Sequence, residues 1–131
     1  MTTCTGEFSI AAWDEETYAE PGPDRKLTSA TVEQQLTGDI TGTGGVRWLM
    51  CYDPDGTARF VGLQHITGSI DGREGTVVLE SEGRFDGQEA TGAWTIVPGS
   101  GTAGLAGITG TGGFRAPMGG TPSFTLDCRF E

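Results

Sequence analysis

The sequence QHITGSIDGREGTVVL, residues 64–79, contains an Asp-Gly pair, Asp71-Gly72, between two β-prone runs. Asp-Gly is one of the strongest short-range signals for a β-hairpin, because the tight turn needs residues that tolerate positive φ. Two further pairs, Asp55-Gly56 and Asp86-Gly87, lie at near-equal spacing on either side. The chain is therefore predicted to be all-β and to form an antiparallel meander.

Strand-like segments follow one another along the whole chain, and no segment has the periodicity of a helix. They lie near residues 4–14, 28–41, 46–53, 57–70, 73–85, 88–97, 107–114 and 122–131. Strands of this length in a chain with 23 glycines among 131 residues must curl and close, or leave long edges unpaired. The length fits a single domain over residues 1–131. We predict one small β-barrel.

The Asp71-Gly72 turn determines which side chains of its hairpin share a face. As a two-residue type I′ loop it pairs Ile70 with Arg73 and Gln64 with Leu79. Even positions before the turn then share a face with odd positions after it.

The two other turns extend this face. A two-residue Asp86-Gly87 turn sets Leu79 opposite Trp94. At the first turn, a three-residue loop, Pro54-Asp55-Gly56, with its glycine in the left-handed conformation is needed to place Trp48 on the same face. The predicted interior is Val46, Trp48, Met50, Tyr52, Phe60, Gly62, Gln64, Ile66, Val77, Leu79, Ser81, Trp94 and Ile96, joined by Val32, Gln34, Leu36, Ile40, Phe124, Leu126, Cys128 and Phe130 from other strands.

The opposite face is expected to be the solvent face. It carries Arg47, Glu80 and His65, which is the only histidine. Apolar residues interrupt it, and we expect some of this surface to be a homo-oligomer contact; they are Leu49, Val61, Leu63 and Val78.

Charge and composition exclude several classes of partner. The formal net charge is -10, which disfavours nucleic acid and anionic membrane surfaces. No stretch has the ~18 apolar residues of a membrane span, and the N-terminus lacks the pattern of a signal peptide. We expect a cytoplasmic protein whose three cysteines stay reduced. By the alternation of side chains, Cys4 and Cys128 both point inward from the two terminal strands. These strands could be neighbours where the barrel closes.

Three apparent motifs do not support a cofactor or metal site. Residues 99–104 match G-x-G-x-x-G, but the glycine-rich sequence that follows cannot supply the helix that binds a pyrophosphate, and a barrel corner is favoured. Residues 53–56 begin like a calcium loop without its later ligands. His65 has no second histidine for zinc and no nucleophile elbow. We expect no cofactor and no metal.

The predicted interior contains few polar groups. Gln34, Gln64, Ser81 and Tyr52 lie among apolar residues, and a buried amide left unpaired costs roughly 1–3 kcal/mol. They must bond to one another, to trapped water or to a ligand. Three glycines leave space next to the indoles of adjacent strands, which either the indoles or a ligand would fill; they are Gly62, Gly83 and Gly92.

Several blocks, in this order, resemble a bacterial family of uncharacterised proteins with the allene oxide cyclase-like barrel. They are Gly6-Glu7-Phe8, Trp13-Asp14-Glu15, residues 36–42, 60–62, 68–75 and 97–110. The resemblance covers nearly the whole chain and implies an eight-stranded antiparallel barrel. Plant enzymes with this barrel cyclise a fatty-acid epoxide, and dirigent proteins steer a radical coupling. The plant Glu-x-Asn of the first strand is absent here, where residues 10–13 read IAAW, so the plant catalytic residues are not transferred.

Together these observations suggest a barrel that binds one small, largely apolar molecule and guides its cyclisation or isomerisation by conformational restraint. Tyr52 is the candidate general acid or donor, and Gln64 and Gln34 would orient a substrate oxygen. Asp14 enters the site if the first strand shifts by one residue. The candidate substrate-binding residues are Trp48, Trp94, Met50, Phe60, Gly62, Ser81 and Leu79.

Two other interpretations stay open. One is a carrier of small molecules that performs no chemistry, and the other is a structural barrel whose indoles fill the lumen. A ligand needs a cavity of roughly 300 Å³. The size of the cavity therefore separates the structural barrel from the other two.

Overall fold

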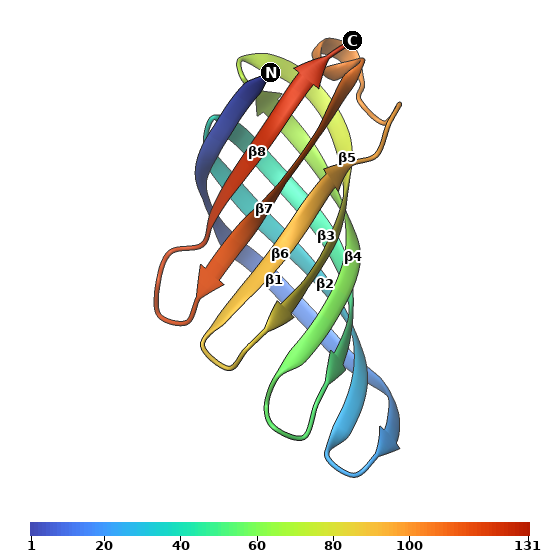
Figure 1. The fold of residues 1–131 in the computed structure, drawn as a ribbon. Helices are drawn as coiled ribbons and strands as arrows, with labels where there is room; N and C mark the ends of the chain where they lie inside the picture. The colour runs from blue at the N-terminus through green and yellow to red at the C-terminus, as the bar shows by residue number, and fades with distance from the viewer.

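The structure is a computed structural model that describes all residues, 1–131. Eight strands and one short helical turn make up the chain (Figure 1). The elements are β1 (Thr2–Gly22), β2 (Arg25–Gly38), β3 (Ile40–Tyr52), β4 (Ala58–Ile70), β5 (Arg73–Phe85), β6 (Glu89–Ile96), η1 (Ala103–Leu105), β7 (Ile108–Pro117) and β8 (Ser123–Phe130). The one helical turn has three residues, and no helix of the chain is long and apolar enough to cross a membrane.

The strands form one closed antiparallel barrel in sequence order, β1 to β8. Each strand pairs with the next along the chain, and β1 closes the ring against β8, where Thr2 lies opposite Cys128 and Glu7 opposite Ser123. This arrangement confirms the all-β class, the antiparallel meander and the closed ring of eight strands.

Two of the predicted turns have the expected geometry. At the β4–β5 turn, Asp71 (φ 52°) and Gly72 (φ 77°) both have positive φ, and Ile70 lies opposite Arg73. At the β3–β4 turn Gly56 has φ 88°, and the amide of Asp53 donates to the carbonyl of Thr57 around the three-residue loop. The predicted pairing of Gln64 with Leu79 is confirmed.

The third turn corrects the predicted pairing of β5 with β6. Ser81, not Leu79, lies opposite Trp94. The Asp86 carboxylate accepts hydrogen bonds from the backbone amides of Gln88 and Glu89, which widens the loop beyond two residues. Because the shift in pairing is two residues, every side chain keeps its predicted face.

The first strands differ from the predicted segments. β1 continues to Gly22, and the segment predicted at 28–41 spans the end of β2 and the start of β3. The break falls at Gly38, whose φ is 101°, and at Asp39, whose carboxylate accepts the amide of Thr5. Both residues redirect the chain, so a run of β-prone residues is divided into two strands.

The pairing of β1 with β8, which closes the barrel, covers only the first part of β1. β1 pairs with β8 over Thr2–Glu7, but with β2 as far as Gly22. The second half of β1 therefore has one hydrogen-bonded edge and one free edge. In Figure 1 the β1–β2 hairpin extends beyond the other hairpins at the lower end. Charged side chains protect such an edge from pairing with other chains, and here they are Asp14, Glu16 and Glu20.

At the other end, the loop between β6 and β7 covers the edge of β5. The amide of Thr102 donates to the carbonyl of Thr76, and the Ser100 hydroxyl accepts the amide of Val78. This loop contains residues 99–104, the stretch that matches the dinucleotide-binding pattern. It therefore pairs with β5 as irregular backbone and not as a nucleotide-binding turn.

The interior face is the predicted one. Its residues are buried or half-buried, while Arg47, His65 and Glu80 are exposed. Cys4 and Cys128 are buried free thiols, as predicted. Burial and the neighbouring Cys128 raise the pKa of Cys4 to about 12. Thiols protonated to this degree are poor nucleophiles, so both cysteines serve as small core residues.

The outer face of β3 and β4 carries the predicted apolar surface. Leu49, Val61 and Leu63 are 49%, 51% and 58% exposed. Arg47 lies on one side of them and Glu80 on the other, because Leu63 is opposite Arg47 on β3 and opposite Glu80 on β5. That this surface is a homo-oligomer contact stays a prediction.

Candidate functional site

The barrel contains an apolar cavity of about 320 Å³ at its lower end. Its wall is made by side chains near the ends of several hairpins. At this end the second half of β1 has no partner on its β8 side, so the ring of strands is open there. The lining residues are Phe8, Ile10, Trp13, Gln34, Trp48, Met50, Tyr52, Ala58, Phe60, Phe85, Ala90, Phe114, Ala116 and Pro122. A cavity of this size lies within the range of small-molecule sites, so the lumen is not filled throughout.

Aromatic residues make up half of this wall, and several of their rings pack on one another. The Trp48 ring meets the Phe60 ring edge-on, with centroids 4.8 Å apart, and Phe60 stacks on Phe114 at 6.1 Å. Phe8 meets Phe114 edge-on at 5.9 Å. Pairs of this geometry each contribute about 0.5–1.5 kcal/mol beyond the burial of their area. The wall is therefore a rigid surface.

The interior glycines accommodate these rings. A Cβ atom on Gly62 would lie 2.7 Å from Cε3 of Trp48, one on Gly83 would lie 2.7 Å from Cζ of Phe60, and one on Gly92 would lie 2.2 Å from Cε1 of Phe114. The space beside the glycines is thus taken by aromatic rings. Of the two alternatives left open by the sequence, the indole fills the space at Gly62, because Trp48 covers this glycine.

The two interior glutamines form a pair. Nε2 of Gln64 donates to Oε1 of Gln34 at 2.6 Å. Gln64 is 1% exposed and lies behind Gln34, which is on the cavity wall. Since Oε1 of Gln34 is used by Gln64, the amide N–H groups of Gln34 are the donors that this pair offers to a ligand.

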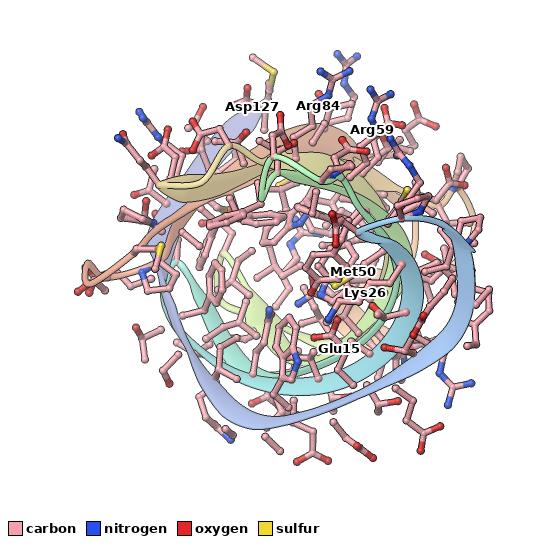
Figure 2. The ribbon with its side chains drawn as sticks, turned by 90° about the horizontal axis from the view of Figure 1, so that it is seen from below. Glu15, Lys26, Met50, Arg59, Arg84 and Asp127 are labelled. Atoms are coloured by element: carbon pink, nitrogen blue, oxygen red, sulfur yellow. The ribbon has the colours of Figure 1, made fainter.

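Glu15 was not predicted as a site residue, and a β-bulge places it at the cavity mouth. Ile10 lies opposite Gln34 and Ala12 opposite Glu33, so Ala11 is an extra residue in β1. The bulge reverses the parity of the rest of the strand. Glu15 becomes half-buried and Asp14 is exposed, so the carboxylate at the site belongs to Glu15. Figure 2 shows Glu15 inside the ring at this end, near Lys26 and Met50.

Three neutral donors hold the Glu15 carboxylate. Its Oε2 accepts the hydroxyls of Tyr52 at 2.6 Å and Thr28 at 2.7 Å, and its Oε1 accepts Nε1 of Trp13 at 3.0 Å. Trp13 and Tyr52 line the cavity. The cluster therefore fixes two side chains of the cavity wall and places a carboxylate next to them.

The hydrogen bonds of this cluster determine its protonation. Burial raises the pKa of Glu15, but hydrogen bonds from Tyr52, Thr28 and Trp13 and the charge of Lys26 outweigh it, so the pKa lies below its ordinary value. Burial, and then the hydrogen bond to Glu15 and its charge, raise the pKa of Tyr52. At neutral pH the pair is an ionised carboxylate and a neutral phenol. Tyr52 is therefore a weak acid, suited to positioning more than to proton transfer.

The lowered pKa of Glu15 predicts a pH-dependent contribution to stability. The ionised form is stabilised in the folded state, so this contribution is present above the unfolded pKa of about 4.3 and is lost as the pH falls through the lower folded pKa. Replacing Glu15 with glutamine is expected to cost about 1 kcal/mol at pH 7, because the side chain is only partly buried, and much less at pH 3. Urea unfolding at both pH values measures the difference. The matched control is Glu16→Gln, and an equal loss in both variants would contradict the prediction.

The structure separates the sequence-predicted site residues into two groups. Tyr52, Gln34, Trp48, Met50 and Phe60 line the cavity. The others lie outside its wall, in the packed part of the barrel: Gln64, Gly62, Leu79, Ser81 and Trp94. The side-chain alternation of the strands placed all ten on one face, but the alternation does not show which side chains of that face border the cavity.

Trp94 shows how the packed half is filled. Its ring stacks on Phe124, with centroids 5.7 Å apart, and it is 1% exposed. Nε1 of Trp94 and the hydroxyl of the opposite residue, Ser81, are buried without hydrogen-bond partners. The indole that was expected to face a ligand is thus a core residue.

Comparison with known proteins gives a family and no activity. A comparison with curated proteins finds no match. Among solved structures, the crystal structure of a protein of unknown function from the DUF3224 family of Shewanella oneidensis MR-1 is similar, with a TM-score of 0.85 and 25% sequence identity over 100% of this chain and 98% of that chain. The family model described as "Protein of unknown function (DUF3224)" matches residues 4–128. This chain therefore belongs to the DUF3224 family.

Proposed function

We propose that this protein binds one small, largely apolar molecule in the cavity at the lower end of the barrel and guides its cyclisation or isomerisation by restraining its conformation. The observation that carries the proposal is the cavity itself, about 320 Å³ with a wall of aromatic and aliphatic side chains. Apolar pockets with a few fixed polar groups are the usual form of small-molecule sites. The resemblance of the sequence to allene oxide cyclase-like barrels supports the same interpretation.

The polar groups at the cavity suit orientation of a substrate better than acid–base chemistry. The amide of Gln34 is available to a carbonyl, ether or epoxide oxygen, and its partner Gln64 fixes its position. The hydroxyl of Tyr52 donates its hydrogen bond to Glu15, so its oxygen is available as an acceptor. A reaction in such a site is accelerated chiefly by holding reacting atoms close together.

A carrier without chemistry is the second candidate function. The observation in its favour is that the phenol proton of Tyr52 is already engaged by Glu15, which leaves the cavity without a free strong acid. The two functions share the cavity and differ in whether the bound molecule is changed.

A cavity-filling variant tests the proposed site. Ala116 of β7 lines the cavity, and Ala116→Leu is expected to lower the affinity for 4-phenylbutanol at least about tenfold, because the larger side chain occupies the ligand's space. Quenching of tryptophan fluorescence measures the binding. Ala93→Leu places the same change on the exposed face of the neighbouring strand β6 and is expected to bind as well as the unmodified protein.

The outcome separates the interpretations. Equal binding by both variants would show that the cavity is not the site. If the cavity binds, the natural molecule can be released by denaturing protein purified from its own cells, identified by mass spectrometry and incubated with fresh protein. A changed product supports the cyclase or isomerase, and recovery of the same molecule supports the carrier.

A further inference from the structure

The mouth of the cavity combines an ionised carboxylate with aromatic rings. Glu15 accepts hydrogen bonds from neutral groups only, and the ion pairs of the chain, Arg25 with Asp53 and Arg115 with Glu89, do not include it. A carboxylate of this kind keeps its negative charge without a cation in direct contact.

The aromatic side chains of the wall add to this field. Trp13, Trp48 and Tyr52 line the cavity together with four phenylalanines, Phe8, Phe60, Phe85 and Phe114. The face of an aromatic ring carries partial negative charge, and groups of such faces bind ammonium and quaternary ammonium ions in proteins. At the mouth, the face of Tyr52 attracts a cation in this way.

A cation already lies at this position in the structure. Nζ of Lys26 is 4.8 Å from the centroid of the Tyr52 ring, and its charge contributes to the low pKa of Glu15. Lys26 is exposed on β2 and lies opposite Tyr52 in the barrel. Its ammonium can move into solvent and be replaced by that of a ligand.

We propose that the molecule bound in the cavity carries an ammonium or quaternary ammonium group, which lies at the mouth between Glu15 and the aromatic rings and replaces Nζ of Lys26. This inference rests on the proposed function and adds the chemical class of its ligand. The overall charge favours the same sign, because the chain carries a formal net charge of -10. A negative surface concentrates cations near the protein and repels anionic molecules.

Three probes that differ in head group test the proposal: 4-phenylbutylamine, 4-phenylbutanol and 4-phenylbutanoate. At pH 7 they carry a positive, no and a negative charge, and calorimetry measures their binding to the whole protein. The amine is expected to bind about tenfold tighter than the alcohol, and the carboxylate more weakly than both. Lys26→Met is expected to tighten amine binding because it removes the competing ammonium.

Matched variants separate the local charge from the net charge. Glu15→Gln is expected to weaken amine binding about tenfold more than it weakens alcohol binding, because both probes lose the fixed positions of Tyr52 and Trp13 but only the amine loses the opposite charge. Glu16→Gln removes the same charge from a side chain that faces outward, and amine binding should stay within about twofold. Equal losses in the two variants would contradict a direct role of Glu15.

The same measurements distinguish failure of this inference from failure of the proposed function. Tightest binding of the carboxylate, lost in Lys26→Met, would overturn the cationic ligand and assign Lys26 to an anion. Equal binding of all three probes would also overturn it, while the apolar cavity would remain the site. Binding of none of the three would contradict the proposed function as well.

Discussion

Replacing Trp48 with alanine is expected to lower the free energy of unfolding by about 4 kcal/mol, since large-to-small changes at buried aromatic residues cost about 3–5 kcal/mol. Trp48 is 5% exposed, meets Phe60 edge-on at 4.8 Å and covers Gly62. Its loss would remove these contacts and enlarge the cavity. Urea unfolding, followed by the remaining tryptophan fluorescence, measures the change.

The matched control for this variant is Trp13→Ala. Trp13 also lines the cavity, but it is 48% exposed, so the expected cost is below about 1 kcal/mol. Comparable losses in the two variants would mean that Trp48 is not part of the packed interior. Trp48→Ala should in addition admit ligands too large for the unmodified cavity, because it removes a wall without removing a polar group.

Replacing Gly62 with alanine is expected to cost about 3 kcal/mol, although the change adds a single methyl group. The new Cβ would lie 2.4 Å from the carbonyl oxygen of Arg47 and 2.7 Å from Cε3 of Trp48. Neither can move cheaply, since one is backbone and the other is held by neighbouring rings, and overpacking of this kind costs about 1–3 kcal/mol. Thermal unfolding is expected to shift down by about 10 °C.

Gly45→Ala provides the comparison. Gly45 also lies within a strand, in β3, but a Cβ atom there meets nothing within 4 Å. Alanine is then tolerated, and stability should change by less than about 0.5 kcal/mol. If Gly62→Ala is as stable as Gly45→Ala, the close approach of Trp48 to the strand is refuted.

The faces of the strands could be predicted because they depend on local rules. A two-residue loop at Asp71-Gly72 and a three-residue loop ending at Gly56 fix the side-chain alternation, and the alternation then places Trp48 and Gln64 inside and His65 outside. An error of two residues, as at Asp86, leaves the faces unchanged, because strand alternation has a period of two. Prediction of the fold was therefore robust to the error in pairing.

The candidate site was harder to predict because it depends on one inserted residue. The bulge at Ala11 lies in the sequence SIAAW, which contains neither glycine nor proline to mark it. Without the bulge the parity of β1 excludes Glu15, so the carboxylate that holds Tyr52 and Trp13 could not be found. The extent of the cavity within the barrel was the second missing quantity. Gln34 lies on the cavity wall, whereas its hydrogen-bond partner Gln64 does not.

The free edge of β1 bears on how quickly a molecule enters and leaves the cavity. Ile10 and Trp13 belong to the cavity wall and also to the part of β1 that is bonded to β2 alone. Segments with few cross-strand bonds open locally with a lower free energy than a whole domain unfolds. The second half of β1 can therefore separate from β2 while the β2–β3 pairing and the closed part of the ring stay intact. The lifetime of a complex would then be set by the opening rate of this segment.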